Sequence, residues 1–148
     1  MNDQGTITHY GTSDSDYSTD VISRQADDII SNSASQGPFF AYVAPIAPHD
    51  PSTPAPRDAH DYGGIQSPRL PSFDEADVSD KPSWIKELSK LSSSQISAIN
   101  KRHEKRVESL QAVDDLVKGV VQARQRPQAR PRGVAAGDVR QTQRSALA

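Results

Sequence analysis

The sequence predicts an α/β fold, and three observations support this class. Aliphatic residues recur at helical spacing from Ile22 to Ile30, the pair Gly37-Pro38 ends that pattern, and an uncharged apolar run follows at Pro38–Ala44. A short apolar run without clean alternation is typical of a strand that is buried on both faces of a parallel sheet. A helix, a turn and a buried strand in this order indicate α/β architecture.

A short strand is expected close to the amino terminus. Residues 2–5 have the composition of a turn, and the following run Thr6–Tyr10 has the composition of a strand. Ile7 is the only aliphatic residue of that run, so the alternation is weak.

The first helix follows a polar loop. Ser18 or Thr19 is the predicted N-cap, because a hydroxyl there can accept a hydrogen bond from the first turn. Asp20 suits the positive end of the helix dipole. We expect this helix to end within residues 31–37, where Ser, Asn, Gln and Gly dominate.

The predicted buried strand runs into a stiff loop that carries prolines at 45, 48, 51, 54 and 56. Proline cannot continue a central strand, so this loop leaves the carboxyl end of the strand. Ligand sites of α/β proteins lie at such ends, and His49 lies in this loop. Residues 57–93 are expected to be mostly irregular, with one helical turn around Trp84–Leu88.

The longest predicted helix starts at Ser92–Ser94 and continues to about Gln122. A stripe at alternating gaps of three and four residues supports it: Ile96, Ile99, His103, Arg106 or Val107, Leu110, Val113, Val117 and Val120. The stripe lasts about four heptads and includes charged and polar positions, which argues against a free coiled coil. We therefore expect this stripe to pack against a sheet or another helix.

Composition excludes several classes of protein. The chain has no cysteine, so a disulfide framework, a cysteine-bound metal and a thiol nucleophile are ruled out. The net charge of -2 predicts neither nucleic-acid nor membrane binding. The start of the chain lacks the apolar core of a signal peptide, and no apolar run is long enough to span a membrane.

The charge is nevertheless uneven along the chain. From Arg124 to the end there are six Arg and one Asp, about +5, against 11 basic and 18 acidic residues in the rest, about -7. No apolar period and no aromatic residue occur after Ala123, so we expect residues 124–148 to form a disordered, solvated basic tail.

Three stretches together resemble sulfatases, most closely the N-acetylglucosamine-6-sulfatase type. Tyr17–Ile22 is similar to the family's Tyr-x-Thr-Asp-Val helix start, and Pro38–Pro51 is similar to its strand ending in Ala-Pro-His-x-Pro. Ser109–Val117, with Pro71–Phe73 and Trp84 before it, is similar to the family's Ser-Val-Asp-Asp-Leu-Val helix. The order and spacing agree over roughly residues 9–121.

This resemblance implies a piece of an alkaline-phosphatase-like α/β/α sandwich that hydrolyses sulfate esters. It implies a formylglycine nucleophile made from a Cys or Ser in Cys/Ser-x-Pro-x-Arg, a calcium ion held by acidic residues, and a histidine that contacts the sulfate. Only that histidine maps here, onto His49. An imidazole N–H can hold a sulfate oxygen and stabilise charge on the leaving oxygen.

The departures from the family pattern concern the catalytic parts. The chain has no Cys, and Ser67-Pro68-Arg69 lacks the spacer residue of the nucleophile motif. The acidic calcium ligands have no counterpart, and an Arg/Gln/Pro-rich stretch stands where the family's strand and Asp-Asn-Gly loop follow the helix. We therefore assign no catalytic and no metal-binding residue, and we expect neither calcium nor formylglycine in this chain.

Other polar groups have a structural interpretation. His49-Asp50 and His60-Asp61 do not match known zinc spacings. Asp114 and Asp115 are adjacent on a helix, so they do not face each other as acid–base pairs do. His103 is expected to be a partly buried packing residue.

The sequence thus predicts a partial sulfatase catalytic domain at residues 1–123 and a basic tail at 124–148. The expected function is that of a sulfatase-family fragment that is inactive alone. The alternative is a non-enzymatic remnant or an interaction module that uses its long helix. A sulfate ester would be the substrate only in a full-length parent, no nucleic acid or membrane is expected as a partner, and the oligomeric state and compartment stay open; members of the family are often secreted or lysosomal.

Overall fold

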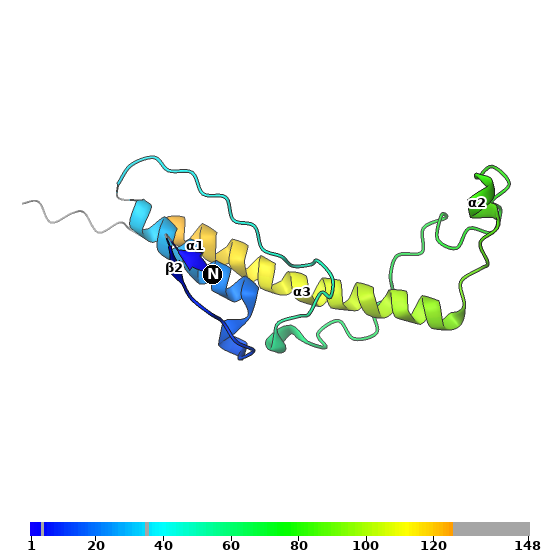
Figure 1. Ribbon diagram of the computed structural model, residues 1–148, viewed down its shortest axis with the longest axis horizontal. Coiled ribbons are helices and arrows are strands. Elements are labelled where there is room, and N and C mark those ends of the chain that lie inside the picture. Colours follow the sequence, from blue (N-terminus) through cyan, green and yellow to red (C-terminus); the bar gives the residue numbers. More distant parts are fainter. Residues whose placement is uncertain (4, 35, 126–148) are drawn as a thin grey trace, which may run out of the picture.

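The computed structural model describes residues 1–3, 5–34 and 36–125. The molecule is elongated around one long helix, α3 (Ser93–Gln125), and a shorter helix, α1 (Ser18–Ser33), lies beside the carboxyl-terminal half of α3 (Figure 1). Two strands of two residues each, β1 (Asn2–Asp3) and β2 (Thr6–Ile7), complete the elements near the amino terminus. The described part is therefore mostly helical.

The amino-terminal hairpin confirms a strand at Thr6–Ile7. It pairs antiparallel with β1, with Asn2 opposite Ile7 and Asp3 opposite Thr6. The turn is stabilised by Asn2, whose Oδ1 accepts a hydrogen bond of 2.9 Å from the Gly5 amide. Gly5 has φ +94°, a conformation that glycine adopts without strain. Both strands are exposed, so the hairpin adds little to the core.

Helix α1 follows a short 3₁₀ turn at Asp14–Asp16 and ends within the predicted range, at Ser33. The predicted cap is wrong. Tyr17 is the N-cap residue and no side chain caps the helix, while Thr19 lies inside the first turn and is only 1% exposed. Packing explains the difference, because Thr19 lies on the buried face of the helix together with Ala26 and Ile30.

Helix α3 begins with a reciprocal cap. The Gln95 amide donates to Ser92 Oγ at 3.3 Å, and the Ser92 amide donates to Gln95 Oε1 at 2.8 Å, which is the capping-box arrangement. The start agrees with the prediction. The helix continues through Arg124 and Gln125, so these two residues of the expected tail are helical. The remainder of that tail, residues 126–148, lies outside the described residues.

The predicted buried stripe of α3 is wrong in its orientation. The buried side chains are Glu104, Glu108, Ser109, Ala112, Leu116 and Ala123. Of the predicted stripe, Leu110 is 38% exposed and Val117 is 53% exposed, whereas His103 is half-buried as expected. The buried face of α3 thus combines small side chains with Leu116 and two glutamates, and the apolar stripe is left partly in solvent.

The polar residues on the buried face of α3 hold a loop. The amides of His60, Gly64 and Ser67 donate to Glu108 Oε1 at 2.9 Å, Glu104 Oε2 at 3.1 Å and Asn100 Oδ1 at 3.2 Å. The three acceptors are four residues apart, so they lie on one helix face. The irregular segment is therefore fixed along α3 by its backbone, which explains why charged side chains are buried there.

The rest of the long connection agrees with the prediction of irregular chain. It contains a 3₁₀ turn at Pro56–Asp58 and a helical turn, α2 (Ser83–Lys86), at the predicted place. Trp84 and Leu88 beside it are each 66% exposed. No helix in the described ranges combines the length and apolar character that crossing a membrane requires.

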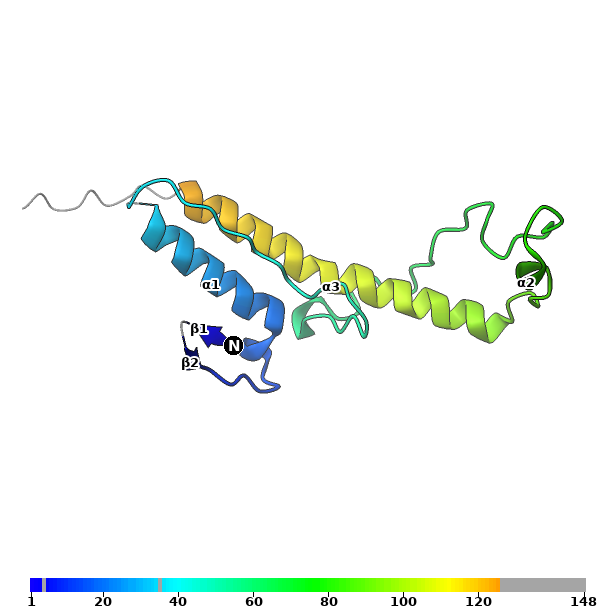
Figure 2. The same ribbon diagram turned by 45° about the horizontal axis from the view of Figure 1, so that its top comes forward.

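The predicted buried strand at Pro38–Ala44 is wrong, and the sandwich it implied is not formed by the described residues. The segment is extended and runs beside the carboxyl-terminal half of α3 in both views (Figures 1 and 2). Phe40 and Tyr42 are 89% and 85% exposed. A strand needs a neighbour to pair its backbone, and no other described segment lies along either edge.

Candidate functional site

His49 lies in a tight turn that immediately follows the extended segment. Its amide donates to the Ile46 carbonyl at 2.9 Å, and its own carbonyl accepts from the Ser52 amide at 2.8 Å. Ser52 Oγ donates to the Pro48 carbonyl at 2.8 Å. Ser52 is 3% exposed and has φ +52°, so a buried hydroxyl closes the turn. The proline-rich sequence thus forms a defined loop around the histidine.

The imidazole ring of His49 has a fixed direction. Nδ1 lies 2.8 Å from the Asp50 carbonyl oxygen. A carbonyl oxygen can only accept a hydrogen bond, so Nδ1 carries the hydrogen and Nε2 is the ring nitrogen that can meet a ligand. In the neutral ring Nε2 accepts; it donates to an anion only when the ring is protonated.

A pocket of about 430 Å³ opens beside His49. Its wall combines the loop before α1, the first turn of α1, the proline-rich loop and one residue of α3, Ser109. The apolar part of the wall includes Ile46 and Pro54. Segments of the first and second family-like motifs, distant in the sequence, therefore meet at this pocket.

The charge of the pocket wall is unfavourable for a lone anion. Asp14, Asp16 and Asp50 line it, and His49 is the only side chain there that can carry a positive charge. One carboxylate oxygen of Asp16 is already paired, because its Oδ2 accepts a hydrogen bond of 2.8 Å from the Gly11 amide. A protonated His49 is therefore the source of positive charge that the described part of the wall offers to an anion.

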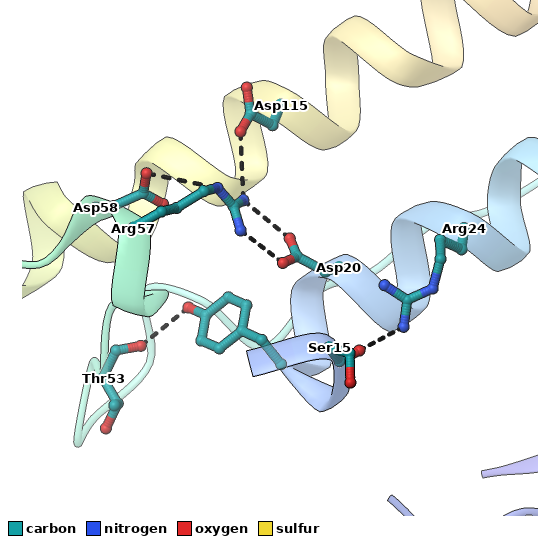
Figure 3. A network of polar contacts seen from close by, with 8 residues as sticks. Ser15, Asp20, Arg24, Thr53, Arg57, Asp58 and Asp115 are labelled. Atoms are coloured by element: carbon teal, nitrogen blue, oxygen red, sulfur yellow. Dashed lines mark hydrogen bonds and ion pairs between the residues drawn. The ribbon is translucent and has the colours of Figure 1, made fainter. Parts of the chain in front are cut away.

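Two contacts fix the loop to α1 and α3. Tyr17, from the first family-like motif, donates its hydroxyl to the Thr53 carbonyl at 2.9 Å, and burial raises the pKa of this tyrosine. Arg57 forms a two-point ion pair with Asp20 of α1 and a contact of 3.3 Å with Asp115 of α3 (Figure 3). Its Nε also lies 3.6 Å from Asp58.

Arg57 thus joins the first and third family-like motifs through one side chain. The hydrogen bond and charge of Asp20 raise the pKa of this guanidinium, which is charged in any case. No local sequence pattern predicts these contacts of Arg57. Asp115, which was expected to be structural, contributes one carboxylate oxygen to this ion pair.

The other predicted polar residues have separate places. His60 donates its backbone amide to Glu108, whereas His49 lines the pocket. Over the described ranges, no three or more His, Asp or Glu side chains come together in a group that could hold a metal ion. The chain has no cysteine for a formylglycine precursor. The sequence also has no Ser-x-Pro-x-Arg run that could take the place of the cysteine motif.

Comparisons with known proteins point to one family. Residues 1–132 match the family model described as Sulfatase. The chain is 32% identical over 114 residues to "Sulfatase ppz1" of Metarhizium majus and 34% identical over 127 residues to an arylsulfatase of Volvox carteri. It is 31% identical over 108 residues to the N-acetylglucosamine-6-sulfatase of Homo sapiens. No solved structure matches the chain significantly.

The chain belongs to the sulfatase family, as the three motifs predicted. The matched regions cover 71%, 71% and 72% of this chain but only 27%, 20% and 19% of those three relatives. The chain therefore corresponds to a fragment of the relatives' length. Another relative is named a putative extracellular sulfatase of Caenorhabditis elegans.

Proposed function

We propose that this chain is the sulfate-contacting segment of a sulfatase domain with an alkaline-phosphatase-like sandwich, and that His49 meets the sulfate of a sulfate ester. The observation that carries the proposal is the direction of the imidazole. Nδ1 is held by the Asp50 carbonyl, and Nε2 is left for a ligand beside a pocket. The relatives that are named sulfatases support sulfate esters as the substrate class.

The contribution of His49 is binding and charge stabilisation. A protonated Nε2 donates to a sulfate oxygen and favours negative charge on the oxygen that leaves. The carboxylates of Asp14, Asp16 and Asp50 oppose the anion, so strong binding requires positive charge beyond that of the described pocket wall.

The chain alone is proposed to be inactive. Sulfate-ester hydrolysis in the family passes through a covalent intermediate, and this step requires an activated nucleophile such as the formylglycine hydrate. The chain offers no cysteine, and its described residues offer no acidic group that fits a metal. Residues 1–123 are the part that we assign to the catalytic domain.

The test is hydrolysis of a chromogenic aryl sulfate by the purified chain with added calcium. We expect no turnover above buffer for the natural chain or for His49→Ala. The proposed inactivity would be contradicted if the natural chain showed turnover that was reduced in His49→Ala but not in the matched loop variant His60→Ala. The nucleophile would then have to be another residue of this chain.

The alternative function, an interaction module that uses the long helix, is favoured by a different observation. Leu110 and Val117 of the predicted apolar stripe of α3 are exposed, and so is the neighbouring Val121. Sulfate contact and a protein interaction through α3 are compatible functions. In a fragment of a domain, apolar helix surfaces that the missing part would cover stay free to bind a partner.

A further inference from the structure

Four carboxyl groups and one guanidinium come together where the proline-rich loop meets α1 and α3. The carboxyl groups belong to Asp20 of α1, Asp58 and Asp61 of the loop and Asp115 of α3. Figure 3 shows those of Asp20, Asp58 and Asp115 around the side chain of Arg57. Four negative charges and one positive charge give this Arg57 cluster a formal charge of -3, so one cation is shared among several anions.

The donors of Arg57 are shared unevenly among the carboxylates. Nη1 and Nη2 lie 2.6 Å and 3.0 Å from the two carboxylate oxygens of Asp20, and Nη2 also lies 3.3 Å from Asp115 Oδ2. Asp58 is contacted only through Nε, and the distance of 3.6 Å to its Oδ1 is too long for a hydrogen bond. Asp58 is therefore the carboxylate that Arg57 pairs least well.

Asp58 is also the most buried carboxyl group in contact with Arg57. The residue is 8% exposed, and its Oδ2 has no hydrogen-bond partner among the described residues. Burial without full pairing costs the charged form of a carboxyl group more than the neutral form. Burial accordingly raises the pKa of Asp58; Arg57 opposes this effect, and the charges of Asp115, Asp61 and Asp20 add to it.

We propose that Asp58 is a proton-operated anchor: when its carboxyl group takes up a proton, the 3₁₀ turn Pro56–Asp58 is held more firmly against α1 and α3. The proton removes the negative charge that is paired least well and leaves the guanidinium of Arg57 to Asp20 and Asp115. Because this turn ends the proline-rich loop, the protonation state of Asp58 sets how firmly the loop is attached.

Tyr17 is the titratable group that faces the cluster from the start of α1. Its hydroxyl donates to the carbonyl of Thr53, three residues before the turn. Burial raises the pKa of Tyr17, and the charges of Asp20 and Asp58 raise it as well. Tyr17 therefore stays a neutral donor while Asp58 titrates, and it continues to hold the loop in both states of the anchor.

The direction of the pH effect follows from the raised pKa. A carboxyl group of this kind stabilises the folded state fully below its unfolded pKa of about 3.9, and the contribution is lost as the pH rises through the raised value. Glu104 acts in the opposite direction, because its pKa is lowered. The attachment of the loop should therefore be firmest between the lowered pKa of Glu104 and the raised pKa of Asp58.

The first test follows the side-chain carboxyl carbon of Asp58 by NMR in the full chain as the pH is varied. We expect its titration midpoint to lie above about 3.9, the ordinary value for aspartate. Asp115→Asn should lower the midpoint, because it removes a charge that raises the pKa of Asp58. Asp28→Asn, at an exposed position of α1, is the matched control and should leave the midpoint unchanged.

The second test measures the attachment of the turn by hydrogen exchange. The Ala59 amide donates to the Ala55 carbonyl at 3.1 Å, so its protection relative to the intrinsic exchange rate reports on the turn. Protection should rise as the pH is lowered through the raised pKa of Asp58, by up to about tenfold for each unit of the shift. Asp58→Asn should lack this rise and should be the better protected protein at neutral pH, because it carries no charge there.

The comparison isolates Asp58, since both proteins keep the same histidines and the same glutamates on α3. Far-UV circular dichroism checks that the helices of each variant are intact. Three results would overturn the proposal: a midpoint of Asp58 at or below about 3.9, equal shifts in Asp115→Asn and Asp28→Asn, or the same rise in Ala59 protection in Asp58→Asn. The titration of the natural chain decides the question even where a variant does not fold. No step of these tests uses sulfate or His49, so their outcome is independent of the proposed function.

Discussion

Arg57 and Asp20 form a two-point ion pair: Nη1 lies 2.6 Å from Oδ2, and Nη2 lies 3.0 Å from Oδ1. Nη2 also reaches Asp115 Oδ2 at 3.3 Å. One guanidinium therefore connects the start of α1, the end of the proline-rich loop and the middle of α3. Because the planar group presents several donors in a fixed arrangement, lysine cannot reproduce these contacts.

Replacement of Arg57 by lysine is expected to lower the free energy of unfolding by about 1 kcal/mol, since the side chain is partly exposed and surface pairs contribute little. Chemical denaturation followed by circular dichroism measures the change. Arg102→Lys is the matched control, because Arg102 lies 4.0 Å from Asp50 at one atom only. Equal effects of the two variants would contradict a special role for the two-point pair.

Sulfate binding is expected to depend on the protonation of His49. Nδ1 is already used by the Asp50 carbonyl, so Nε2 can donate to an anion only in the charged ring. Sulfate binding should therefore require the protonated ring and be lost as the pH is raised. Histidine resonances followed by NMR during sodium sulfate titration measure this.

The control for that titration is the pair His49→Gln and His60→Gln at constant ionic strength with sodium chloride. The first should abolish the sulfate-dependent shifts of neighbouring amides, and the second should not. Shifts that persist in His49→Gln would mean that the anion binds elsewhere.

The loop on α3 is expected to loosen in acid. The hydrogen bond from Lys101 lowers the pKa of Glu104, and the bond from the Gly64 amide lowers it further. A carboxyl group with a lowered pKa in the folded state stabilises that state above its unfolded pKa of about 4.3 and loses the contribution as the pH falls through the lower value. The Gly64 amide should therefore lose protection, relative to its intrinsic exchange rate, as the pH falls through the lowered pKa of Glu104.

Hydrogen exchange of the Gly64 amide measures this, and Glu104→Gln provides the comparison. Glutamine keeps an acceptor oxygen but has no charge to lose, so its Gly64 amide should show no acid-dependent step. An identical step in both proteins would assign the acid effect to another group.

The core is expected to be sensitive at Leu116. Four of the seven buried apolar side chains in the described part are alanines, so Leu116 supplies much of the packing between the helices. Leu116→Ala should cost about 2–5 kcal/mol. Its neighbour Val117 is 53% exposed, and Val117→Ala should change stability by less than about 0.5 kcal/mol. Thermal melts compare the two; equal losses would mean that α3 is buried differently.

The two helices could be predicted from the sequence because their signals are local. The period of Ile22–Ile30 and the Ser92-x-x-Gln95 cap lie within each element, and both helices end close to the expected residues. The buried face of α3 could not be predicted. Glu104 and Glu108 are buried because they accept from backbone amides forty or more residues away, and no periodicity reports such a partner.

The extended segment could not be predicted fully for a different reason. Composition correctly identified Phe39–Ala44 as extended and apolar, but pairing depends on a neighbour that composition does not contain. In the candidate site, His49 was found through the family-like motif, whereas Arg57 and Ser52 were missed. An arginine beside prolines and a serine in a turn carry no signal until the loop has a shape.

The shape of the turn around His49 and its position in the molecule depend on different residues. The hydrogen bonds that shape it join residues 46–52 to one another, from the Ile46 carbonyl to the Ser52 hydroxyl. Its location is set by other residues, through the Tyr17 hydroxyl on Thr53 and through Arg57. A substitution at Tyr17 or Arg57 can thus shift the position of the imidazole without changing its orientation within the turn. The seven-residue turn can in turn be grafted onto an unrelated scaffold with the orientation of its histidine preserved.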